Sequence, residues 1–144
     1  MREAVASLGA GASGEVVDLA SFRSIVAFTD RVKASHPRID TLVDNAGVCM
    51  PTYGKTAEDF ELTLGTNAIG TALLTHLLIP SIAASPDGRI VVMSSVAATY
   101  SAGPKPWRRL ADIGGEALTT STFDEYYDSK LLNTLWAKSL QVRL

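Results

Sequence analysis

Only one cysteine, Cys49, occurs in the 144-residue sequence, so the chain cannot form an internal disulfide. We therefore expect a reducing compartment and predict a cytoplasmic protein. The two histidines, His36 and His76, lack the spacing of metal ligands, and we predict no metal site. The formal net charge is only -2, which gives no support to binding of nucleic acid or of an anionic membrane surface.

Long hydrophobic runs are also absent. The longest apolar stretch covers residues 68–84 and is interrupted by Thr71, Thr75, His76, Pro80 and Ser81. This pattern predicts a buried helix rather than a transmembrane segment. The chain begins without the apolar run of a signal peptide. Since 47% of the residues are apolar and 19% are charged, we predict one globular domain over residues 1–144.

The six residues from Gly9 to Gly14 match the G-x-G-x-x-G pattern of dinucleotide-binding loops. Such a loop binds a pyrophosphate only when it follows a strand and opens a helix. Here residues 1–8 have the pattern of a short helix, and a short strand is expected at 15–18. We interpret the motif as a glycine-rich connection, with a phosphate loop as the less favoured alternative.

The hydrophobic pattern predicts strands and helices in alternation. We expect strands at 15–18, 39–44 and 89–93, and helices from about Phe22 to the Ser35-His36-Pro37 stop, at about 57–83, and from near Phe123 to the end. Ser21 is the expected cap of the first helix, and Thr56 with Asp59 has the spacing of a capping box for the second. This alternation predicts an α/β fold with a parallel sheet.

Three details of this pattern shape the expected site. Gly65, Gly70 and Pro80 are expected to break or kink the helix at 57–83. The consecutive apolar residues 90–92 predict a strand that is buried on both faces. Residues 96–121 lose all periodicity and indicate an irregular insert, and loops of this length are usually functional or disordered.

Polar residues follow the ends of the expected strands, where ligands bind in open parallel sheets. Asp18 ends the first strand, the Asp44-Asn45-Ala46-Gly47 turn follows the second, and Ser94-Ser95 follows the third. Tyr126 and Lys130 are spaced to share one helical face. A cation beside a phenol favours the phenolate. Each of these features alone has an ordinary structural explanation, such as a helix cap or a surface pair.

Together, these motifs resemble the short-chain dehydrogenase/reductase family, from about Ala4 to Leu144. The matching segments are Asp18-Leu19, Asp44-Asn45-Ala46-Gly47, Asn67-Ala68-Ile69-Gly70, Ile90 to Ser95, and Tyr126 with Lys130. The turn has Asp44 where the family has asparagine. The long segment between Ser95 and Tyr126 is most similar to the retinol-dehydrogenase-like branch.

The resemblance implies an NAD(P)-dependent oxidoreductase that acts on a small alcohol or carbonyl substrate. It implies a catalytic group in which Tyr126 is the general acid/base and Ser95 binds the substrate oxygen. It also implies that Asn67 holds a relay water and that Lys130 holds the nicotinamide ribose. For the cofactor, it implies that Asp18 and Leu19 lie beside the adenine and that Asn45, Ala46 and Gly47 allow a close approach of the backbone.

The resemblance further implies a partial Rossmann-type, doubly wound parallel sheet that lacks the family's first two and last two strands. The choice between NAD and NADP stays open, because the discriminating residues fall outside the chain. We expect strands 39–44 and 89–94 to be parallel neighbours, with 15–18 pairing with 39–44. An exposed sheet edge would favour a homo-oligomer. The alternative to an enzyme is a non-catalytic remnant that acts through protein contacts.

Overall fold

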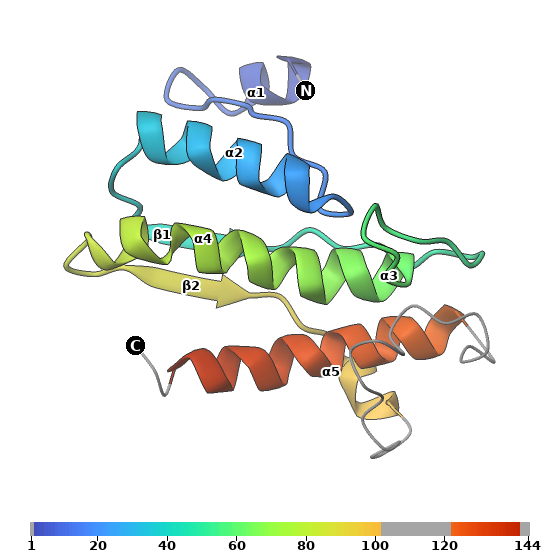
Figure 1. Cartoon of the computed structure of the whole chain (residues 1–144). Helices are drawn as coiled ribbons and strands as arrows, with labels where there is room; N and C mark the ends of the chain where they lie inside the picture. The colour runs from blue at the N-terminus through green and yellow to red at the C-terminus, as the bar shows by residue number, and fades with distance from the viewer. Residues whose placement is uncertain (1, 102–121, 142–144) are drawn as a thin grey trace.

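The structure is a computed structural model that describes residues 2–101 and 122–141. In chain order the elements are α1 (Arg2–Ser7), α2 (Phe22–Ser35), β1 (Thr41–Asp44), α3 (Leu62–Leu64), η1 (Gly65–Gly70), α4 (Thr71–Ala83), β2 (Arg89–Val92), η2 (Val96–Tyr100) and α5 (Thr122–Gln141). The segment η1 is a π-helix and η2 is a 3₁₀ helix. Because α3, η1 and α4 follow one another without a gap, they form one helical run (Figure 1).

Two parallel strands pair in the described part of the chain. β1 and β2 are in register from Thr41 opposite Arg89 to Asp44 opposite Val92, so the expected parallel neighbours are confirmed. After each strand the chain returns along the sheet as a helix (Figure 1). The N-terminal ends of the long helices therefore gather at the carboxyl edge of the sheet, where the predicted site residues lie.

The hydrophobic core lies between the helices and one face of the sheet. Ile25 of α2 packs with Leu74, Leu78 and Ile82 of α4. Leu42 and Ile90, which are partners in the β-ladder, pack against the same cluster. In Figure 1, α4 lies between α2 and α5. This packing fixes the helical run, and with it the π-segment, against the two strands.

The opposite face of the sheet is open in the described part of the chain. The ladder partners Val43 and Val91 are 54% and 44% exposed. The prediction that residues 90–92 are buried on both faces is therefore wrong for the described residues. The core cluster contacts only the alternate residues, because successive side chains of a strand point to opposite faces.

The strand predicted at 15–18 does not form, and its pairing with 39–44 is also wrong. The backbone of this segment is bonded to side chains of α2 instead. The carbonyl of Val16 accepts from Arg31 Nη2 at 3.1 Å, and the N–H of Asp18 donates to Ser24 Oγ at 2.9 Å. The Gly9 to Gly14 motif follows α1 and opens no helix, as expected for a connection.

The long helical run begins later than the capping box predicts. Glu61 caps it, since Glu61 Oε2 accepts from the N–H of Leu64 at 2.7 Å. Thr56 instead closes a turn, with Oγ1 accepting from the N–H groups of Glu58 and Phe60 at 3.3 Å. The expected cap at Ser21 is confirmed by its bond from the N–H of Ser24 at 3.4 Å.

The residues that were predicted to break or kink the helix differ in their effect on it. Gly65 and Gly70 are the two ends of the π-segment, and a Cβ on Gly70 would collide with the carbonyl oxygen of Leu19. Pro80 lies inside α4, which continues through it to Ala83. Of the predicted insert, residues 96–100 form η2, and residues 102–121 lie outside the described residues.

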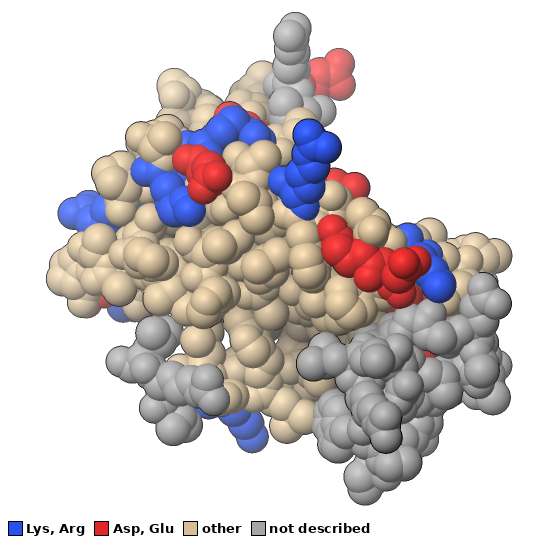
Figure 2. Space-filling model, viewed as in Figure 1, with Lys and Arg blue, Asp and Glu red and all other residues tan. Residues whose placement is uncertain are grey.

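Among the described residues, one helical run is long and apolar enough to cross a membrane, Leu62–Ala83. Its mean hydropathy is 1.4, and 56% of its apolar window is buried inside the fold. A core helix passes the same test of length and composition. On the face shown in Figure 2, acidic and basic side chains lie beside one another, so the described residues form no continuous basic surface there.

Candidate active site

Asn67 occupies the π-helical segment η1 and is fully buried. Its Oδ1 accepts from the N–H of Val48 at 2.8 Å, and its Nδ2 donates to the carbonyl of the same residue at 2.8 Å. Nδ2 also donates to Ser129 Oγ at 3.1 Å. Asn67 therefore joins the turn after β1 to helix α5. π-Helical turns of this kind are frequent at functional sites.

Gly47 lies against both Asn67 and Lys130. A Cβ on Gly47 would lie 3.3 Å from Asn67 Oδ1 and 3.3 Å from Lys130 Nζ. The neighbouring Asn45 and Ala46 are exposed. The absence of a side chain at Gly47 thus leaves a small space between an amide oxygen and an ammonium, below an exposed turn.

Tyr126 and Lys130 share one face of α5, as their spacing predicts. Lys130 Nζ lies 5.6 Å from the centre of the Tyr126 ring, within the range of a cation–π contact. Lys130 is 4% exposed and its Nζ donates to the carbonyl of Met93 at 3.4 Å. None of the ion pairs between described residues includes Lys130. Burial lowers the pKa of Lys130 below its ordinary value.

The two serines after β2 have different contacts. Ser94 Oγ donates to the carbonyl of Lys130 at 2.8 Å and lies 2.7 Å from Thr134 Oγ1. Ser95 instead caps η2, with its Oγ accepting from the N–H of Ala97 at 3.1 Å. Ser94 therefore fixes α5 to the end of β2, while Ser95 keeps its hydroxyl proton without an acceptor among the described residues.

Sequence reasoning missed several side chains that fix α5 in place. Ser129, fully buried, donates from Oγ to the carbonyl of Tyr126 at 2.7 Å. Asn133 Nδ2 donates to the carbonyl of Met93 at 3.3 Å. The sequence shows a hydroxyl residue, Ser129, directly before Lys130, and this could have suggested a role for it. Its partner Asn67 could not be found in this way, because it is 62 residues away in the sequence.

Asp18 and Leu19 lie in the turn before α2 rather than at the end of a strand. Asp18 is exposed, and its Oδ1 accepts from the N–H of Ala20 at 2.9 Å. Leu19 packs on the core, and its carbonyl faces Gly70 at the end of η1. The structure thus brings Asn67, Gly47, Tyr126 and Lys130 together, whereas Asp18 and Leu19 adjoin the far end of the π-segment.

Asp44, at the end of β1, is the residue that departs from the family's turn. It is 8% exposed, and its Oδ2 accepts from Thr75 Oγ1 at 2.6 Å. Burial raises the pKa of the Asp44 carboxyl, and the hydrogen bond from Thr75 opposes that shift.

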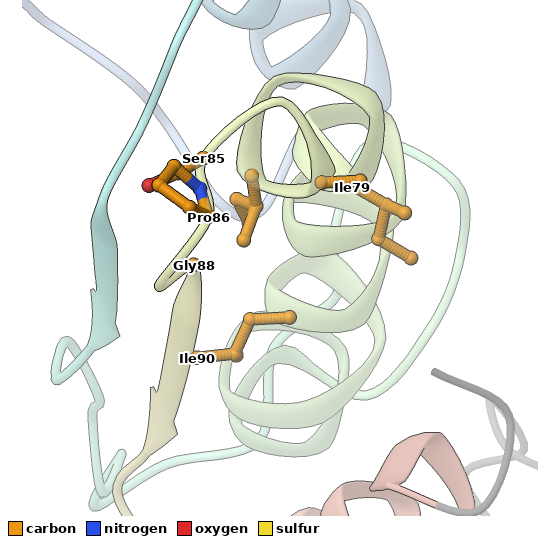
Figure 3. A pocket seen from close by; sticks show the side chains of 7 residues that line it. Ile79, Ser85, Pro86, Gly88 and Ile90 are labelled. Atoms are coloured by element: carbon orange, nitrogen blue, oxygen red, sulfur yellow. The ribbon is translucent and has the colours of Figure 1, made fainter.

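A hollow of about 300 Å³ lies at the opposite end of the sheet. Figure 3 shows Ile79, Ser85, Pro86, Gly88 and Ile90 around it, where α4 ends and β2 begins. Since the predicted site residues cluster at the carboxyl edge, this hollow is separate from the candidate site.

Comparison with known proteins shows which protein family the chain resembles. The short chain dehydrogenase family model matches residues 1–126. Retinol dehydrogenase 14 of Mus musculus is 38% identical over 138 residues, covering 93% of this chain and 40% of the relative. Dehydrogenase/reductase SDR family member 13 of Bos taurus is 39% identical over 130 residues, covering 89% of this chain and 32% of the relative.

Solved structures with a similar fold cover nearly the whole chain. An uncharacterized protein from Mycobacterium Paratuberculosis superposes with a TM-score of 0.79 at 29% identity, covering 99% of this chain and 48% of that one. A metagenomic short-chain oxidoreductase in complex with NADP has a TM-score of 0.64 at 29% identity, covering 96% of this chain and 56% of that one.

The chain belongs to the short-chain dehydrogenase family. Its α/β fold is the expected partial Rossmann-type sheet, and its relatives include retinol dehydrogenases. It spans about 40% of the length of retinol dehydrogenase 14.

Proposed function

We propose that this chain carries the proton-transfer side of a nicotinamide-dependent oxidoreductase site. The observation that supports this best is the buried Lys130 ammonium, which lies between the Tyr126 ring and Gly47 and has no carboxylate partner among the described residues. An ammonium buried without an anion is costly. Hydroxyl groups of a bound ribose would offset that cost by accepting its hydrogen bonds.

Tyr126 would act as the general acid/base of the reaction. It would donate a proton to a carbonyl oxygen in reduction, or accept one from an alcohol in oxidation, with the Lys130 ammonium 5.6 Å from the centre of its ring. Ser95 would donate a hydrogen bond to the same substrate oxygen, because its own proton has no acceptor among the described residues. The bound nicotinamide would supply hydride transfer at its C4 carbon.

Asn67 and Lys130 would hold a relay water between them. Asn67 Oδ1 and Lys130 Nζ both lie 3.3 Å from the point that a Cβ on Gly47 would occupy. A water molecule beside Gly47, within hydrogen-bond reach of both groups, would accept from the ammonium and donate to the amide oxygen. This assignment gives Gly47 a role, because any other residue would fill the space.

The cofactor would lie along the carboxyl edge of the sheet. Asn45, Ala46 and Gly47 would approach it through their backbone, and Asp18 with Leu19 would lie towards the adenine. The NADP complex of a 29% identical relative supports a nicotinamide dinucleotide but leaves NAD and NADP open for this chain. The names of the relatives support an alcohol or carbonyl substrate, with retinol as the first compound to assay.

Titration of the chain with NADPH and NADH, followed by nucleotide fluorescence, tests the proposal. We expect saturable binding of one nucleotide and retinol oxidation or retinal reduction that depends on it. Tyr126→Phe should keep nucleotide binding and lower kcat by about 1000-fold, because the proton would lose its donor and acceptor. Tyr127→Phe, the neighbouring tyrosine on α5, is the matched control and should keep most of the activity.

Absence of saturable binding would contradict the proposal for this chain. It would favour the alternative of a non-catalytic protein that acts through protein contacts, and gel filtration at several concentrations would then test the expected homo-oligomer. The single domain over residues 1–144 and the cytoplasmic location stay predictions.

A further inference from the structure

Ser129 lies at the junction of three segments that form the candidate site. It is fully buried in α5, one residue before Lys130. Its Oγ donates to the carbonyl of Tyr126 at 2.7 Å and accepts from Asn67 Nδ2 at 3.1 Å. Through Asn67 it is connected to Val48, directly after the Asn45–Gly47 turn.

The donors and acceptors in this junction allow only one arrangement. The N–H of Val48 requires an acceptor, which is Asn67 Oδ1, so Asn67 Nδ2 must face the carbonyl of Val48 and Ser129. The Ser129 proton is used within its own helix by the Tyr126 carbonyl. Ser129 can therefore act only as an acceptor towards Asn67, and that is what the second N–H of the Asn67 amide needs.

We propose that Ser129 is a positioning residue that links Asn67 to the Tyr126 turn of α5 and so fixes Tyr126 relative to the Asn45–Gly47 turn. Without this hydroxyl, α5 would still be joined to β2 by Ser94 and Asn133, but no described side chain would join it to Asn67. The kinetic consequence rests on the proposed function, whereas the link itself does not.

The link is tested by NMR of the whole chain with ¹⁵N-labelled asparagine and ¹³C-labelled tyrosine. In Ser129→Ala we expect solvent exchange of the Asn67 side-chain amide to accelerate at least about tenfold, because a buried bond is lost. The ring signals of Tyr126 should shift. Alanine is the best helix former, so the variant should fold. Ser139→Ala, at an exposed serine of the same helix, is the matched control and should change neither signal.

Kinetics test the positioning role. In Ser129→Ala we expect kcat to fall about tenfold while the KM for nucleotide changes less than about threefold, because misplacement of a proton donor affects the chemical step more than binding. Ser129→Thr keeps the hydroxyl and should restore most of kcat. A purely structural serine would instead lower the amount of folded protein and leave kcat per folded molecule unchanged.

Unchanged exchange of the Asn67 amide in Ser129→Ala would overturn the link. Faster exchange with unshifted Tyr126 signals, or a kcat equal to that of Ser139→Ala, would overturn the positioning role. A wild-type chain that binds no nucleotide would refute the proposed function, while the exchange and ring signals would still decide the inference.

Discussion

At the carboxyl edge of the sheet, buried polar side chains bind one another and the backbone, whereas at the amino edge isoleucines surround a hollow. Asn67 and Ser129 are both fully buried and both bonded across elements. At the amino edge, Ile79, Ile82 and Ile90 line a space of about 300 Å³. The same two strands and the same helical run form both edges.

The difference shows how one helix can both stabilise a fold and place a site. Hydrogen bonds are directional, so the polar edge fixes which atoms face each other. Apolar contacts depend mainly on buried area, so the isoleucines at the amino edge contribute stability without fixing an orientation. Directional contacts at that edge come from other residues, such as Ser85, whose Oγ donates to Asp40 Oδ1 at 2.6 Å. The change from π-helix to α-helix after Gly70 lies between the carboxyl edge, with its buried polar side chains, and the amino edge, with its isoleucines.

The largest effect is expected from a substitution at Gly70, the last residue of the π-helical segment η1. In Gly70→Ala, the new Cβ would collide with the backbone carbonyl of Leu19, which cannot move as a side chain can. We expect a loss of about 3 kcal/mol or more in the free energy of unfolding, measured with urea, and loss of nucleotide binding. Gly11→Ala is the control, since its Cβ would meet nothing within 4 Å. Equal stabilities of the two variants would show that η1 is not tightly packed.

Sequence reasoning located much of this edge because its signals are local. The spacing of Tyr126 and Lys130 fixes a common helical face, and the apolar strands with the crossover between them fix the β1–β2 pairing. The family resemblance added Asn67 and Ser95, whose roles stay predictions.

Features that depend on distant partners were not predictable in this way. The segment 15–18 has strand-like residues, but its backbone is bonded to α2 rather than to a strand. Glu61 rather than Thr56 caps the helical run, because Thr56 closes a turn in which Asp59 has a φ of 66°. Ser129 gains its importance from Asn67, which no local pattern connects to it.

An intermediate effect is expected from a substitution at the amino edge of the sheet. Ile82 is 5% exposed, so Ile82→Ala should lower the free energy of unfolding by about 3 kcal/mol through lost burial and the cavity left behind. Ile79→Ala, at a half-buried residue around the same hollow, should cost less. Both variants should keep the nucleotide affinity of the folded chain, measured at a temperature well below unfolding. A change in affinity would show that the two edges are coupled through α4.

The smallest effect is expected at Asp44, where the polar edge contains a buried carboxyl. Its pKa is raised above the ordinary 3.8 by burial, so the folded chain holds this proton more tightly than the unfolded chain. The stabilisation from the protonated form is complete below about pH 4 and is lost as the pH rises through the folded pKa. Asp44→Asn keeps an acceptor for Thr75 Oγ1 without a charge. We expect it to be more stable than wild type at pH 7 by about 1 kcal/mol or less.

Urea unfolding of the wild type and of Asp44→Asn between pH 3 and pH 8 measures the difference between their free energies of unfolding. The dependence of that difference on pH shows its cause. A charge effect predicts that the advantage of Asp44→Asn narrows as the pH falls through the raised pKa of the folded carboxyl, and that the charge contribution is gone below about pH 4, where the wild-type carboxyl is neutral in both the folded and the unfolded chain. A packing effect predicts a difference that is constant with pH. Asp87→Asn, in an exposed turn, controls for removal of a negative charge from the chain. A wild type that is more stable at pH 7 would mean that the ionised carboxylate gains more from Thr75 and its surroundings than burial costs, and the polar edge would then use a charge as well as hydrogen bonds to hold its geometry.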